Sequence, residues 1–209
     1  VTPAFTPLPL THTQFPNLKG PKKFRDINLL FEEGLREMGL SRQNFPTIVL
    51  TLTNNDLRKK IAWTIIQQWK EALGVVIEIE SCSFKHLFKK MTKGDHQIGV
   101  MNWLPKIDDP TYTLNAFKDA GEPINFSKWE NSAYRYFLER ANQEADPKRR
   151  NHFLSRAEAI LIKEVPVIPI FHEKECFSRQ DYIEGIYPSR VGSIDFKHAY
   201  INKKCKYAK

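Results

Sequence analysis

The clearest hydrophobic pattern lies in the first half of the chain. Residues 47–53 alternate apolar side chains with mostly threonine, a period of two that is typical of a β-strand. Apolar residues then recur at every fourth position from Leu57 to Leu73, which predicts a helix that buries this stripe and ends at Gly74. A second strand is expected over residues 75–80. Strand, helix and strand at this spacing indicate a βαβ unit with parallel strands.

Helical and extended patterns continue on both sides of this unit. Helices are expected at about 24–38, 84–91, 111–117, 132–144 and from 146 onward, where Asp146 is an N-cap and Pro147 the first helical residue. The last two helices are expected to bury Tyr134, Phe137, Leu138, Ala141, Phe153, Leu154, Ala157, Ile160 and Leu161. Residues 97–103 predict a third strand, and 165–171 an extended segment whose two prolines suit an edge or a crossing. The predicted fold class is α/β, a mixed sheet with packed helices.

The two ends of the chain carry less pattern. Residues 1–23 are rich in proline and threonine, which predicts an irregular segment, and turns with short strands are expected after Cys176. No run of apolar residues approaches the roughly 20 that a membrane-spanning helix needs. The first residue is Val1 and no leader pattern follows it, so either a leader was removed or the chain is a piece of a longer protein. We favour the second interpretation.

Charge changes this picture little. The 209 residues carry a formal net charge of +8, and residues 197–209 alone contain five lysines and no acid. A solvated tail is the expected role of this cluster, and a basic arm that contacts an acidic partner is the alternative. Neither an RNA-binding signature nor zinc-finger spacing is present, so no nucleic acid is expected as a partner.

The search for catalytic chemistry is negative. The chain lacks a nucleophile elbow, a phosphate-binding loop, a dinucleotide fingerprint and a metalloprotease helix, so we expect no enzyme and no cofactor. The three cysteines, Cys82, Cys176 and Cys205, are too few and too distant for a disulfide framework or a zinc ribbon. Residues 172–176 are the densest set of potential metal ligands, but their spacing favours an ordinary strand end.

Three other features have two interpretations each. Asp108 and Asp109 precede Pro110, and the favoured interpretation is that they cap a helix or form a turn. The alternative is that they are the paired carboxylates of a metal-dependent hydrolase. Arg58 lies in the first turn of its helix, where a cation opposes the helix dipole unless an anion binds there. Trp103 follows a strand and either lines a ligand groove or packs against a helix.

Several segments resemble one known family. Residues 46–62 and 69–75 are similar to the extracytoplasmic oligopeptide-binding proteins of bacterial ATP-driven importers. Residues 102–111 (Asn-Trp-Leu-Pro-Lys-Ile-Asp-Asp-Pro-Thr) resemble that family's Gly-Trp-x-x-Asp-x-x-[Asp/Glu]-Pro segment, and 146–170 resemble its late helix and the strand that returns across the hinge. The matches keep the family's order from about residue 24 to residue 200.

The resemblance implies a fold and a set of partners. Members of the family have two lobes that close over an extended peptide and pair with its backbone. Residues 1–178 would be the C-terminal lobe of a type II periplasmic-binding-protein-like fold, and 179–209 a closing segment that in relatives packs on the other lobe. The implied partners are a peptide or peptide-like solute, the missing N-terminal lobe and importer membrane subunits. The implied location is periplasmic or extracytoplasmic, with only indirect contact with the membrane.

The resemblance also places a ligand site. Its implied ligand-binding residues are Asn102, Trp103, Leu104, Lys106, Asp108 and Arg58, with Arg58 near the ligand's carboxylate end. Lys106 stands where oligopeptide binders have an aspartate for the peptide's ammonium group, and like charges repel strongly when they are desolvated. Asp108 takes that role, or the amine is masked or bound elsewhere, or the ligand is anionic, or the lobe has lost peptide binding.

These observations give two hypotheses about function. The first is the solute-binding component of a peptide transport system, which captures short peptides in a cleft to which this chain contributes one lobe. The alternative is a non-transport interaction protein that retains the lobe scaffold and uses its basic tail to contact an acidic partner.

Overall fold

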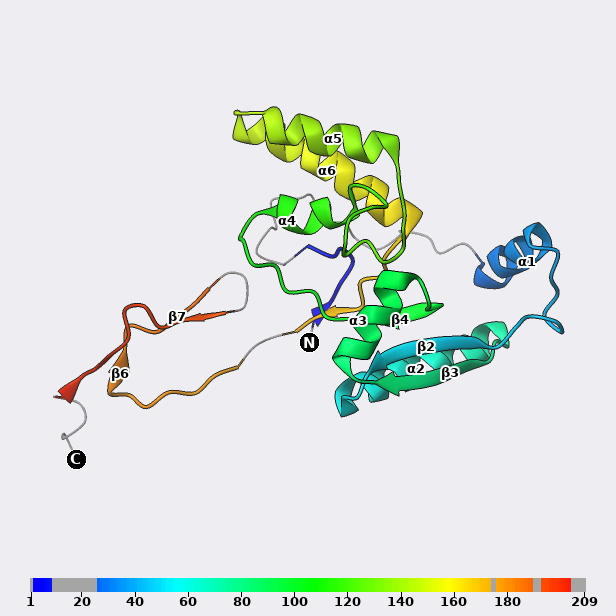
Figure 1. The fold of residues 1–209 in the computed structure, drawn as a ribbon, viewed down its shortest axis with the longest axis horizontal. Coiled ribbons are helices and arrows are strands. Elements are labelled where there is room, and N and C mark those ends of the chain that lie inside the picture. Colours follow the sequence, from blue (N-terminus) through cyan, green and yellow to red (C-terminus); the bar gives the residue numbers. More distant parts are fainter. Residues whose placement is uncertain (1, 9–25, 174–175, 190–192, 204–209) are drawn as a thin grey trace. The chain divides into compact units, whose positions relative to one another are not determined.

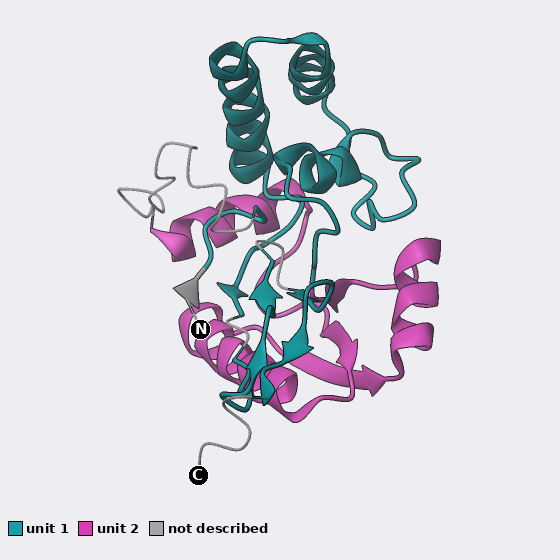
Figure 2. Cartoon of the chain, turned by 90° about the vertical axis from the view of Figure 1, so that its left-hand side faces the viewer, with its two compact units in different colours: residues 1–18, 103–209 teal, residues 19–102 magenta. Residues whose placement is uncertain are grey.

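The computed structural model describes residues 2–8, 26–173, 176–189 and 193–203. The chain divides into two compact units, residues 19–102 and residues 1–18 together with 103–209 (Figure 2). Each unit is described by itself. The predictions for residues 9–23, for the lysines after residue 203 and for Cys205 lie outside the described residues. The division into a lobe over 1–178 and a closing segment over 179–209 stays a prediction.

A parallel sheet is the centre of residues 19–102. Its strands are β2 (Ile48–Thr53), β3 (Ile77–Cys82) and β4 (Ile98–Val100), in the order β3-β2-β4 (Figure 1). Leu50 lies opposite Ile79 on one side and Ile98 on the other. The predicted βαβ unit is therefore confirmed. The third strand is shorter than expected because the chain leaves the sheet after Val100.

Helices cover both faces of this sheet. On one face, Leu50 and Leu52 pack against Ala62 and Ile66 of α2 (Asp56–Leu73). On the other face lies α3 (Phe84–Lys93), and a Cβ added to Gly99 would come within 2.8 Å of the Met91 methyl carbon. Glycine thus allows α3 to approach β4 closely. The remaining helix of this unit is α1 (Ile27–Glu37), which begins at the N-cap Asp26.

The buried face of α2 differs from the predicted one. Leu57 is 52% exposed, so the predicted stripe is wrong at its first residue. Its other four residues are partly buried, and the most buried positions of the helix are Ala62 and Ile66. Each step of four residues turns about 40° around a helix with 3.6 residues per turn, so the five residues of the stripe, which are four such steps, cannot all face one sheet. The small side chain of Ala62 instead allows close contact with the strands.

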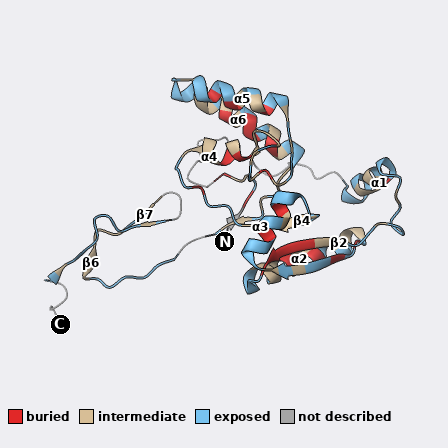
Figure 3. Cartoon of the chain, in the orientation of Figure 1, coloured by how far each residue is buried: buried red, intermediate tan, exposed pale blue. Residues whose placement is uncertain are grey.

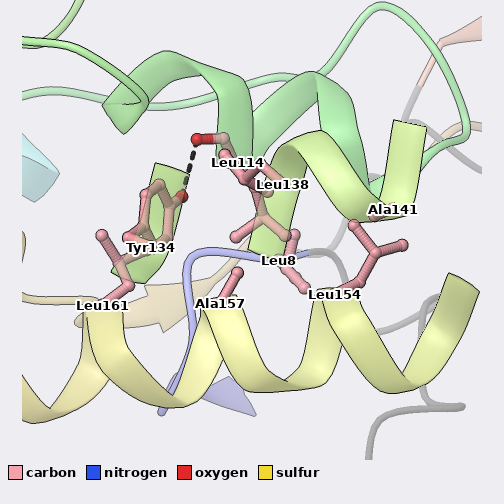
Figure 4. Packing of buried hydrophobic residues seen from close by; sticks show 8 residues of the cluster. All are labelled: Leu8, Leu114, Tyr134, Leu138, Ala141, Leu154, Ala157 and Leu161. Carbon is pink, nitrogen blue, oxygen red and sulfur yellow. Dashed lines mark hydrogen bonds between the residues drawn. The ribbon is translucent and has the colours of Figure 1, made fainter. Parts of the chain in front are cut away.

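Two long helices are the centre of the other unit. α5 (Ser132–Gln143) and α6 (Pro147–Glu164) pack on each other and on α4 (Pro110–Leu114), which continues into a 3₁₀ turn over 115–117. Asp146 is the N-cap of α6 and Pro147 its first residue, as predicted. Figure 4 shows the shared core, which consists of Leu8, Leu114, Tyr134, Leu138, Ala141, Leu154, Ala157 and Leu161. The aromatic side chains expected in this core, Phe137 and Phe153, are only partly buried at its border.

Short antiparallel pairs complete this unit. β1 (Thr2–Pro3) pairs with β5 (Phe171–His172), β6 (Ile183–Glu184) with β9 (Tyr200–Ile201), and β7 (Tyr187–Pro188) with β8 (Ile194–Asp195). Of the extended segment expected at 165–171, only its last residue lies in a strand. Parallel and antiparallel pairing thus both occur, in separate sheets, and the α/β class is confirmed. In the part of the chain that the structure describes, no helix has the length and apolar character needed to cross a bilayer.

Glu158 is a carboxyl group in the core between α6 and the start of the chain. Both buried and exposed residues occur along α6 (Figure 3). Glu158 is 1% exposed, accepts a hydrogen bond from the Thr6 hydroxyl at Oε1, and has no hydrogen-bond partner for Oε2 among the described residues. Burial raises the pKa of Glu158 above its ordinary value. The sequence pattern did not indicate that Glu158 is buried, although it lies between Ala157 and Leu161 on the otherwise apolar face of α6.

Glu158 makes stability depend on pH in a definite direction. Because its pKa is raised in the folded protein, its favourable contribution is complete below the unfolded value of 4.5 and is lost as pH rises through the folded value. We expect Glu158→Gln to reduce this loss of stability with rising pH. The free energy of unfolding of the variant should therefore increase relative to that of the parent protein as pH increases. Urea unfolding at a series of pH values measures the effect, and parallel pH profiles for the two proteins would contradict it.

Val165 ends α6 in the left-handed region, with φ 54°. A β-branched residue is strained there by roughly 1–2 kcal/mol, and the side chain is 53% exposed, so little packing offsets the strain. We expect Val165→Gly to raise the free energy of unfolding by about 0.5–1 kcal/mol after the entropy cost of glycine. The matched control is Ile168→Gly, which removes an exposed side chain from the same segment without relieving strain and should lower stability. Urea titration of both variants tests the difference in sign.

Candidate functional site

Trp103 is held at its edge and accessible elsewhere. Its indole nitrogen, Nε1, donates a hydrogen bond to Thr113 Oγ1 at 2.9 Å, and its ring lies 5.8 Å from the Tyr112 ring at an interplanar angle of 30°. Both partners belong to α4, and Thr113 is buried. The Trp103 side chain nevertheless stays 39% exposed. The indole is therefore a positioned aromatic surface rather than a core residue.

The helix that positions Trp103 is itself fixed by an ion pair. Asp109 is the N-cap of α4 and accepts a hydrogen bond from the backbone nitrogen of Thr111 at 2.8 Å. Both of its carboxylate oxygens accept from Arg150 Nη2, at 3.0 and 2.9 Å. Burial alone would raise the pKa of Asp109, but the bonds from Arg150 and Thr111 outweigh it and lower the pKa below its ordinary value.

These contacts decide between the two interpretations of Asp109. The cap is confirmed, and the carboxylate is already occupied by a guanidinium and a helix end. Asp108, by contrast, is exposed. No group of three or more potential metal ligands occurs among the described residues, which include His172 and Cys176 but not the two residues between 173 and 176. The geometry gives no support to a metal-dependent hydrolase.

The loop over residues 103–108 presents a mixed surface beside Trp103. Pro105 is buried and anchors the loop, whereas Leu104 and Ile107 are 59% and 58% exposed. Lys106 is exposed as well. The loop thus combines two exposed apolar side chains with one exposed cation.

Two further residues that were predicted to bind the ligand lie in the unit formed by residues 19–102. Arg58 folds back on the end of β2, where its Nη1 donates to the Thr53 hydroxyl oxygen. Asn102 follows the last residue of β4 by two positions. Both lie past the carboxyl ends of parallel strands, the edge where α/β sheets generally bind their ligands. Arg58 and Asn102 are thus placed by a different unit from Trp103, Leu104, Lys106 and Asp108.

Comparison with known proteins identifies the family. The model described as "Bacterial extracellular solute-binding proteins, family 5 Middle" matches residues 2–124, more than half of the chain. The chain belongs to this family. The matched region contains all six predicted ligand-binding residues, whose individual roles stay predictions.

Two named relatives and one solved structure are similar to this family 5 chain. It is 32% identical to the oligopeptide-binding protein OppA of Bacillus subtilis, over 95% of this chain and 37% of that protein. It is 31% identical to the dipeptide-binding protein DppE of the same organism, over 81% of this chain and 31% of that protein. The structure of the Escherichia coli murein tripeptide binding protein MppA superposes with a TM-score of 0.79 at 22% identity, over 95% of this chain and 40% of that one. The chain spans less than half the length of each of these three proteins.

The support for Trp103 in this family 5 chain includes residues that the sequence analysis did not select. Tyr112, Thr113 and Arg150 fix the indole and the helix behind it. One signal was available: Arg150 lies near the start of α6, where a cation opposes the helix dipole and therefore indicates a nearby carboxylate. The signal does not say which carboxylate, because Asp109 is 41 residues away.

Substitutions of Asp109 separate its two roles. Asparagine caps helices as well as aspartate does but lacks the charge, so we expect Asp109→Asn to lose about 1 kcal/mol of stability with the ion pair, and Asp109→Ala about 1 kcal/mol more with the cap. Because the pKa of Asp109 is lowered, the ion-pair contribution is present above the unfolded value of 3.8 and is lost as pH falls through the folded value. Urea unfolding at neutral and acid pH checks both statements. Equal losses in the two variants would contradict the separation.

Proposed function

We propose that this chain is part of the solute-binding component of a peptide importer and that it captures short peptides or peptide-like solutes. The observation that carries the proposal is the fixed but accessible indole of Trp103, in the segment of a family 5 chain that precedes α4. The names of OppA and DppE, which describe oligopeptide and dipeptide binding, support the class of ligand.

The chemistry of the surface suits this class of ligand. Trp103, Leu104 and Ile107 offer apolar area for a peptide's side chains. Asp108 is the one predicted ligand-binding residue that would attract an ammonium group. Arg58, which belongs to the other unit, would attract a carboxylate. Binding and release need no covalent chemistry, so the protein acts as a carrier and not as an enzyme. An extracytoplasmic location, a further lobe and importer membrane subunits belong to the same proposal.

The tryptophans provide a direct test. The chain has four, and each indole gives its own resonance in a ¹H–¹⁵N spectrum, assigned by substitution with phenylalanine. We expect mixtures of tripeptides to pentapeptides to move the Trp103 resonance, with dissociation constants on the order of millimolar because one lobe offers only part of a site. Trp129, which donates to Glu164, is the internal reference. A Trp103 resonance that stays fixed, both in this chain and in a longer two-lobed form, would exclude the proposal.

Lys106 should determine which peptides bind. An exposed cation repels a free ammonium terminus, so we expect N-acetylated peptides to bind better than the same peptides with a free amine. Lys106→Asp should reverse this order and change the ratio of the two dissociation constants by roughly tenfold. Lys163→Asp makes the same change of charge in the last turn of α6 and should leave the ratio of the two dissociation constants unchanged. If both variants behave alike, Lys106 does not select the ligand.

A further inference from the structure

The outer edge of β3 has no partner strand in the described part of the chain, because the sheet order is β3-β2-β4. The nitrogen of Ile48 donates to Val76 O at 3.0 Å, and that of Asn54 donates to Cys82 O at 3.1 Å. The carbonyl groups of even-numbered residues therefore point to β2. Since backbone groups alternate along a strand, those of Ile77, Ile79 and Ser81 point to the free edge.

A shallow groove lies beside this edge. Lys59, Lys60, Trp63 and Thr64 of α2 line it together with Ile79 of β3, and its volume is about 480 Å³. Trp63 is 60% exposed and Ile79 is 38% exposed. All of these residues belong to the same compact unit. The groove therefore combines an exposed indole and an aliphatic side chain with two ammonium groups.

The other face of β3 has the opposite charge. Glu78 and Glu80 point to the α3 side, since they alternate with the core residue Ile77. Glu80 is matched within the unit by an ion pair with Lys90 and by a hydrogen bond from the Thr51 hydroxyl at 2.8 Å. Glu78 is exposed. A segment that lies along β3 would thus meet cations on its one face and an acid on the other.

We propose that the β3 edge binds an extended segment of another protein by strand addition. That segment carries acidic and aromatic or aliphatic side chains at alternate positions, which enter the groove, and lysine or arginine at the positions between. Its backbone pairs with Ile77, Ile79 and Ser81, which supplies affinity, and the groove supplies selectivity. The inference does not rest on the proposed peptide transport, which concerns Trp103 and the loop that follows β4.

A second copy of this chain fits the edge poorly. If two β3 strands paired with each other, Lys59 and Lys60 would approach the same lysines, and Glu78 would approach the same glutamate. Like charges on both faces oppose such a pair. Charge complementarity therefore favours a partner with the reverse pattern.

The probe is the acetylated and amidated peptide Thr-Asp-Lys-Phe-Lys-Asp-Thr, which alternates acid, phenylalanine and acid with lysine. We expect it to move the indole resonance of Trp63 and to leave that of Trp103 in place. A peptide of the same composition without the alternation, Asp-Asp-Phe-Thr-Thr-Lys-Lys, should move neither. Methylation of the backbone nitrogen should abolish binding at positions of one parity and preserve it at the other, because alternate N–H groups face β3.

Charge reversal tests the groove. Lys59→Glu combined with Lys60→Glu should weaken binding of the probe at least about tenfold. The matched control combines Lys85→Glu with Lys89→Glu, two exposed lysines of α3, and should retain binding. Three results with the probe would overturn the proposal: a Trp63 resonance that stays fixed at millimolar probe, binding that survives methylation at both parities, or a shift of the Trp103 resonance in place of that of Trp63. Self-association that the reversal at positions 59 and 60 abolishes would make a second copy the occupant and also overturn it.

Discussion

The ion pair of Asp109 and Arg150, in which Arg150 Nη2 donates to both carboxylate oxygens, joins the chemistry of the candidate site to the core behind it. Arg150 belongs to α6, which packs with α5 into the core of its unit, and Asp109 begins the short helix α4. A helix of five residues has little stability of its own, so it depends on its cap and on packing. The position of Trp103, which α4 fixes through Thr113 and Tyr112, depends in turn on this one interaction.

The sequence was sufficient where one residue type has one local role. Gly74 ends α2 in the left-handed conformation, and Asp146 with Pro147 begins α6, because these residues act on the backbone next to them. The alternation in residues 47–53 predicted a strand, and the register over residues 48–53 confirms it. The sequence was not sufficient where the role depends on residues far along the chain. Arg150 and Glu158 could be judged only once their partners Asp109 and Thr6 were known.

The candidate site shows the same division. Trp103 was selected because an aromatic residue after a strand either lines a groove or packs, and its exposure of 39% with a fixed edge favours the first. Asp109 was considered with Asp108 as a carboxylate pair, yet the two differ in their surroundings, one bound to Arg150 and one exposed. Neighbours in the sequence can thus belong to different environments, and spacing alone does not distinguish them.

The two units differ in whether they are built from one continuous stretch of chain, and this difference affects the order in which they form during synthesis. Residues 19–102 are continuous and contain their own sheet and both of its covering helices, so all of their core contacts are available once this stretch has left the ribosome. The other unit is discontinuous. Leu8 packs in one core with Leu154, and Thr6 donates to Glu158, so both depend on partners that are made about 150 residues later. We expect the βαβ unit to fold on the growing chain, while the first residues remain without their partners until α6 has been made.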